Sequence, residues 1–274
     1  MKHLYRAGIC RLLRNRIFWL ELAAVISMAV LLCLCNIRPD SLEPQYLDYP
    51  FFAMTAYNPL FYAAGVSLFL GCEYSYGTIR NKLSAGHTRW AVYSAQMGIA
   101  VLSTLLVILA QYAVVAILGT ALYDGFQASP ALAAQAILFC LLSGCSITCI
   151  CGAIALNCQS RSISVALSML VFLVLLWLTA QISGRLLEPE TIRPLMETGV
   201  GYVSYGDPIP NPAYVSGTLR TVLEFLNDLL PTGPVCQIFN QAFPHPLRCT
   251  LFSLGLMALT WRLGLAKFQT LDIK

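Results

Sequence analysis

Six long apolar stretches limit what this chain can fold into. Each has about 20 residues or more, which at a helical rise of about 1.5 Å per residue crosses the roughly 30 Å apolar core of a bilayer. Of all residues, 58% are hydrophobic and 11% are charged, whereas soluble domains carry roughly 25% charged residues. We therefore expect one all-α polytopic membrane domain over residues 1–274, with spans at 17–37, 52–72, 91–122, 131–157, 163–182 and 247–265.

The placement of Lys and Arg predicts the orientation of these spans, because basic residues gather on the cytoplasmic side. With a cytoplasmic amino terminus, 12 of the 17 basic residues fall inside and five outside, while ten of the 13 acidic residues fall outside. We therefore expect both termini to be cytoplasmic. The net charge of +4 follows from this partition and gives no support to nucleic-acid binding.

The amino terminus mixes apolar residues with Lys2, Arg6, Arg11 and Arg14. Two interpretations remain open: a helix lying on the inner membrane surface, or only a positively charged anchor. The apolar run that follows is longer than the core of a signal peptide, and no Ala-x-Ala cleavage site comes after it. We expect an uncleaved first span.

Residues 183–246 form the one long segment without a predicted span, and the topology places it outside. The segment is rich in proline, with a single helical pattern at 218–230 whose Leu and Val residues share one face. We expect this helix to lie on the outer membrane surface or to cap the bundle. Residues 199–206 are typical of a turn-rich loop or a short hairpin. A disulfide between Cys236 and Cys249 stays an open question.

Polar residues within the spans are few. Glu21 is expected near the cytoplasmic edge, where it reaches water or pairs with Arg14 or Arg16. Interhelical hydrogen bonds are predicted for a set of amides, and a stripe of small residues predicts a close helix contact, either within the subunit or across a dimer. The amides are Asn58, Gln96, Gln111, Gln135 and Asn157, and the small residues are Gly144, Thr148 and Gly152.

Catalytic and cofactor signatures are missing from the sequence. It contains no Gly-x-x-x-x-Gly-Lys-Ser/Thr loop, so the chain is not expected to hydrolyse ATP by itself. Its three histidines, His3, His87 and His245, all fall outside the spans, which leaves no histidine for a metal or a dyad at depth. We predict no catalytic residue, no cofactor and no metal.

A polar and basic loop joins the second and third spans. Thr78 is expected to cap a short helix at about 79–85, Gly86 to end it and Thr88 to cap the next helix. The spacing turns Ile79 and Leu83 toward a partner's cleft or the membrane and leaves Arg80, Asn81 and Lys82 accessible. At the two ends of the loop, Glu73 and Arg89 are expected to pair.

This loop resembles the first cytoplasmic loop of ABC-2 type transporter permeases. The resemblance rests on a Glu that closes the second span, the run Tyr76-Gly-Thr-Ile-Arg-Asn-Lys-Leu83, a Gly and an Arg. The ending Phe268-x-x-x-Asp272-Ile is also similar to that of many bacterial members, although the outer segment is longer than in many relatives. The coupling loop implied by the resemblance comprises Glu73, Tyr76, Gly77, Thr78, Ile79, Arg80, Asn81, Lys82, Leu83, Gly86 and Arg89.

The resemblance implies the permease subunit of an ATP-driven exporter in the bacterial cytoplasmic membrane. Its partners would be a cytoplasmic ABC ATPase and a second permease copy or paralogue, with membrane lipids around them, and its cargo a peptide, a lipid-like compound or a drug. An alternative from another class is an immunity or sensor subunit that binds a peptide without transporting it. Separately from this, Arg80, Lys82 and Arg89 have an alternative interpretation as positively charged membrane anchors only.

Overall fold

The computed structural model describes residues 2–37, 44–193, 195–198, 202–205, 207–241 and 243–272. Arg38, Asp40, Glu43 and Lys274, which belong to the charge count above, lie outside these residues. The same holds for the start and the last residue of the loop predicted at 199–206, at 199–201 and Gly206.

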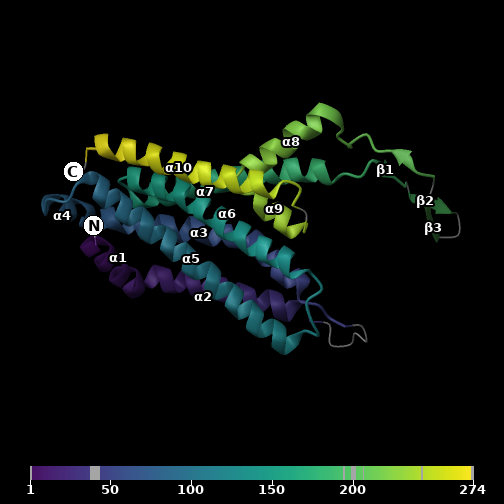
Figure 1. The fold of residues 1–274 in the computed structure, drawn as a ribbon, viewed down its shortest axis with the longest axis horizontal. Coiled ribbons are helices and arrows are strands. Elements are labelled where there is room, and N and C mark those ends of the chain that lie inside the picture. Colours follow the sequence, from purple (N-terminus) through teal and green to yellow (C-terminus); the bar gives the residue numbers. More distant parts are fainter. Residues whose placement is uncertain are drawn as a thin grey trace.

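Six long helices form the body of the molecule and lie side by side (Figure 1). Four shorter helices and two small antiparallel strand pairs, β1 with β4 and β2 with β3, complete the described fold. Both ends of the described chain and α4 lie at one end of the bundle, and the strands extend from the other (Figure 1). The long helices are α2 (Arg16–Cys35), α3 (Asp48–Ser75), α5 (Arg89–Leu122), α6 (Pro130–Asn157), α7 (Arg161–Leu187) and α10 (Pro246–Thr270). The others are α1 (Lys2–Arg14), α4 (Thr78–Ser84), α8 (Gly217–Leu229), α9 (Gly233–Phe239), β1 (Thr191–Ile192), β2 (Leu195–Thr198), β3 (Tyr202–Tyr205) and β4 (Ile209–Pro210).

Five helices in the described part of the chain, α2, α5, α6, α7 and α10, are long and apolar enough to cross a membrane. They coincide with five of the six predicted spans, which confirms a polytopic helical membrane protein. The predicted span 52–72 lies within α3, which is not among the five because Thr55, Tyr57, Asn58 and Pro59 interrupt its apolar run. Helix α3 contacts α2, α5, α6, α7 and α9, so much of its polar surface is covered by protein.

The stripe of small residues on α6 serves packing inside the chain. A side-chain carbon added at Gly144 would lie 2.7 Å from Ile108 of α5, and one at Gly152 would lie 2.8 Å from the sulfur of Met97. Between them the hydroxyls of Thr148 and Thr104 are 2.7 Å apart. Of the two interpretations of this stripe, the structure supports a contact within the subunit.

Most of the side-chain amides predicted to form interhelical hydrogen bonds do so. Asn58 donates to Gln111, Asn157 donates to the carbonyl of Gly264 at 3.0 Å, and Gln96 accepts from Arg11 at 3.4 Å. Gln135 is exposed, and within the described residues it has no such bond.

Glu21 lies near the start of α2, as the sequence suggests, but it does not reach water or pair with an arginine among the described residues. Its side chain is buried against Gly65 of α3, with one carboxylate oxygen unpaired among the described residues. It makes no ion pair there with Arg14 or Arg16, because the helical turn that it occupies faces α3.

Residues 183–246 contain the predicted amphipathic helix as α8. Its polar face is buried and its apolar face is exposed, the reverse of a helix in a soluble protein. Asn227 and Asp228 are buried against the bundle, while Leu219, Val222 and Leu226 are exposed. Asp228 accepts hydrogen bonds from Gln237 and Arg248, each at 2.6 Å, which satisfies the inward carboxylate. The outward apolar face favours an apolar environment. Strands β2 and β3 pair on either side of residues 199–201, in agreement with a hairpin, and Cys236 and Cys249 are free thiols.

Candidate functional site

Helix α4 stands between α3 and α5 at the end of the bundle where the described termini lie (Figure 1). Its start differs from the prediction: the capping residue is Gly77, at φ +63°, and Thr78 is the first helical residue. The Thr78 hydroxyl donates instead to the Glu73 backbone carbonyl, at 3.0 Å, and to the Glu73 carboxylate. Only a residue that tolerates positive φ makes this sharp entry at low cost, which explains the glycine.

The end of α4 matches the prediction. Gly86 has φ +87° and follows the capping residue Ala85. Its amide donates to the carbonyl of Leu83 at 3.0 Å, and the amide of His87 donates to the carbonyl of Lys82 at 3.3 Å. These two bonds form a Schellman ending. Thr88 then caps α5 by accepting from the amide of Ala91 at 3.3 Å, as predicted.

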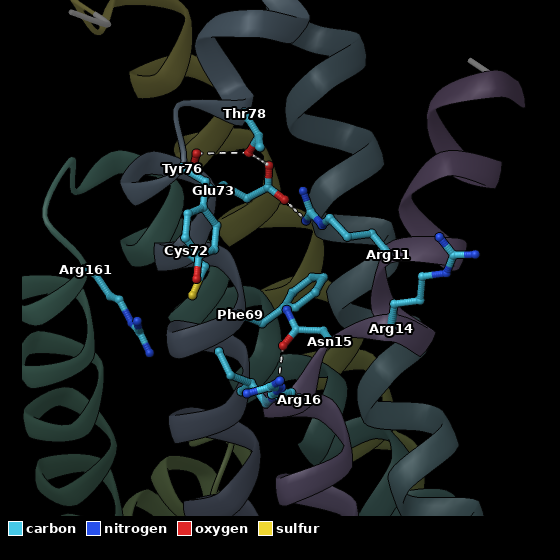
Figure 2. A pocket seen from close by; sticks show the side chains of 11 residues that line it. Arg11, Arg14, Asn15, Arg16, Phe69, Cys72, Glu73, Tyr76, Thr78 and Arg161 are labelled. Atoms are coloured by element: carbon cyan, nitrogen blue, oxygen red, sulfur yellow. Dashed lines mark hydrogen bonds and ion pairs between the residues drawn. The ribbon is translucent and has the colours of Figure 1, made fainter.

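Glu73 is the centre of the site. Its side chain is only 1% exposed, and its carboxylate forms ion pairs with Arg11 of α1 and with Lys82 of α4, the latter at 3.0 Å (Arg11 and Glu73 in Figure 2). One buried carboxylate thus joins three elements, α1, α3 and α4. Arg11 also lies over the ring of Phe69, 5.2 Å from its centroid.

The predicted pairing of Glu73 with Arg89 is wrong. Arg89 donates to the backbone carbonyls of Phe268 at 3.2 Å, of Gln269 at 3.0 Å and of Leu271. The last carbonyls of a helix lack intrahelical partners and attract a cation, so Arg89 binds the end of α10. Phe268 itself is buried against the ring of Tyr93, with centroids 5.5 Å apart. The end of the chain is thereby attached to the start of α5.

The two faces of α4 have different surroundings. Ile79 is 1% exposed and lies in the core, whereas the sequence had suggested that it faces a partner's cleft or lipid. Leu83 packs against the same core cluster. Lys82 is committed to Glu73, whereas Arg80 and Asn81 are exposed. Tyr76, at 73% exposure, extends the open surface. A shallow hollow lies next to this exposed surface and is lined by Arg80, Leu83, Ser84, His87, Thr88 and Arg89.

Burial lowers the pKa of both cations that share the Glu73 carboxylate. Burial and the positive charge of Arg11 lower the pKa of Lys82 to about 7. Burial also lowers the pKa of Arg11, although a guanidinium stays charged at neutral pH. The charge of the cluster therefore changes near physiological pH through Lys82.

Sequence reasoning missed Arg11 as a member of this site. It lies on α1, which packs on α5 with Gly8 against Ile99 and buries Leu4, Gly8 and Leu12. The hydroxyl of Tyr5 donates to the carbonyl of Ser94 at 3.1 Å. The four-residue spacing of that buried face was a signal for a packed helix. It favours the helix among the two interpretations of the amino terminus. No protein-family model matches this chain, and no curated protein matches it significantly.

Proposed function

We propose that this chain is the membrane permease subunit of an ATP-driven exporter of the ABC-2 type, and that α4 is the coupling helix that contacts a separate cytoplasmic ATPase. The observation that carries the proposal is the attachment of α4. A buried carboxylate joins it to α1 and α3, while Arg80 and Asn81 remain exposed at the end of the bundle.

This attachment suits a coupling element. A short helix that transmits movement must shift together with the spans beside it, because a loose loop would absorb the displacement. In this proposal six helices cross the membrane, α3 included, and α4 and both termini are cytoplasmic. Two permease chains, identical or paralogous, would each bind one ATPase and export a peptide, a lipid-like compound or a drug.

The other function, peptide binding without transport, is favoured by a pocket in the outer segment. The pocket has a volume of about 410 Å³ and is lined by residues of α7, α8 and α9, among them Arg220, Glu224 and Asn227. Both signs of charge and the apolar side chains of Leu186 and Phe243 suit a short peptide. An exporter would use the same pocket for release of its cargo.

Affinity purification of the tagged chain from its native membrane separates the two functions. An exporter subunit should bring down a stoichiometric protein with a phosphate-binding Gly-x-x-x-x-Gly-Lys-Ser/Thr loop. Arg80→Glu should reduce that recovery severalfold, and Lys267→Glu, an equal charge reversal at an exposed site on α10 beyond the predicted span, should not. Recovery without such an ATPase would favour the binding function.

A further inference from the structure

A basic pocket lies at the junction of α1 and α2. It has a volume of about 370 Å³ and includes four arginines among its lining residues, Arg11, Arg14, Arg16 and Arg161 (Figure 2). Its apolar lining comes from Ile17, Phe69 and Cys72. The pocket thus combines cations from α1, α2 and α7 with apolar side chains from α3.

The charges in this pocket are not balanced. Glu73 is the one carboxylate among the lining residues, and it is already paired with Arg11 and Lys82. Within the described part of the chain, Arg14, Arg16 and Arg161 have no ion pair. These three arginines are exposed and line one hollow, so an anion that enters it meets a net positive charge.

The starts of two helices place two of these arginines at the pocket. Arg16 is the first residue of α2 and Arg161 the first of α7. A side-chain carbon at Gly71 of α3 would lie 3.3 Å from the Cα of Arg161, so the glycine admits the start of α7. Ser160, which precedes it, makes no side-chain cap, and the free amides of this first turn add positive potential.

The depth of the pocket indicates the source of the anion. Helix α2 begins at Arg16 and has 20 residues. Its length of about 30 Å matches the apolar thickness of a bilayer. Arg16 and Arg161 therefore stand where an apolar span begins, which is the level of lipid headgroups. An anion at this level with an apolar tail would meet both the arginines and Phe69.

We propose that this pocket binds the phosphodiester headgroup of an anionic phospholipid from the inner leaflet. Guanidinium groups hold phosphate oxygens through paired hydrogen bonds, and basic pockets between membrane helices on the cytoplasmic side suit acidic headgroups. Since Glu73 and Thr78 border the same pocket, the bound headgroup adjoins the ion cluster that holds α4. This inference rests on the membrane orientation given with the proposed function, but it does not depend on export.

Native mass spectrometry of the purified full-length chain in detergent tests the site with three probes: dioleoylphosphatidylglycerol, dioleoylphosphatidylcholine and inorganic phosphate. The wild type should retain phosphatidylglycerol in preference to phosphatidylcholine. Arg16→Gln combined with Arg161→Gln should weaken that binding by about tenfold or more, and Arg161→Gln alone by about threefold or more. The matched control, Arg262→Gln with Lys267→Gln, removes two exposed cations from α10 and should leave binding within about twofold.

Equal weakening by the two double variants would reduce the effect to general surface charge and overturn the proposal. Binding of phosphatidylcholine as tight as that of phosphatidylglycerol would also overturn it. Displacement of phosphatidylglycerol from the wild type by an equal concentration of inorganic phosphate would assign the pocket to free phosphate instead of lipid. Thermal unfolding of each variant without lipid checks that the fold is intact, and Arg161→Gln keeps the test open if the double variant does not fold.

Discussion

Replacing Glu73 by Gln removes the charge that holds α4 while keeping the shape of the side chain. The carboxylate is 1% exposed, and its partners Arg11 and Lys82 are 32% and 24% exposed. In Glu73→Gln below pH 7, where Lys82 is protonated in the wild type, two cations would face each other across a neutral amide. The variant should insert into the membrane but lose stability and recover less ATPase than the wild type.

The exposure of the partners sets the size of the effect. Removing one member of a fully buried ion pair costs about 3–5 kcal/mol, because the remaining charge stays desolvated. Arg11 and Lys82 both reach water, so part of their desolvation is relieved, and we expect a loss of about 1–3 kcal/mol. In the Lys82→Met background the same change should cost at least about 1 kcal/mol less, since one of the stranded cations is gone.

Equilibrium unfolding in mixed micelles of SDS and dodecyl maltoside, followed by tryptophan fluorescence, measures these differences. Glu224→Gln is the matched control, because Glu224 is 27% exposed and pairs with Arg220 one turn away on α8; it should change stability by about 0.5 kcal/mol or less. If Glu73→Gln also stays within about 0.5 kcal/mol, or if Lys82→Met gives no coupling, the ion cluster does not hold α4.

Three further changes test other parts of the structure. Gly86→Val should cost about 1 kcal/mol or more, because φ is +87° although the space around Gly86 is open; Gly86→Asn, which tolerates that conformation, should cost less in the same unfolding assay. The pKa of Lys82 is about 7, below the ordinary lysine value of 10.5, so the unfolded chain binds more protons between these pH values. Stability should therefore rise as the pH increases from about 7 to 10, and Lys82→Met should remove that rise. Gly152→Leu should overpack α6 against Met97 and cost about 1–3 kcal/mol, whereas Gly184→Leu, which meets no neighbour, should be tolerated.

Local signals in the sequence predicted the local features of this fold. Five apolar runs coincide with the five most apolar long helices, because each bilayer span is one continuous apolar segment of the sequence. Gly86 ends α4 and Thr88 starts α5 because caps depend on backbone geometry within a few residues. The coupling role of the loop remains a prediction.

The interactions between distant segments could not be read in the same way. Glu73 meets Arg11, and Arg89 meets the end of α10, because helix packing brings together segments that are far apart in the chain. Spacing within the loop suggested the nearest opposite charge instead. The buried polar face of α8 also escaped prediction, since Asp228 is satisfied by Gln237 and Arg248 from two other helices.

Site-specific photo-crosslinking from α4 in the native membrane tests the central claim most directly. A photoreactive phenylalanine analogue at Arg80, which is exposed on α4, should crosslink to a protein that carries the Gly-x-x-x-x-Gly-Lys-Ser/Thr loop. The same analogue at Asp207, which is exposed between β3 and β4 and outside the membrane in the proposed orientation, should not. Crosslinks to such an ATPase from Asp207, or a native complex whose position 80 reacts only with lipid or with non-ATPase proteins, would contradict the account.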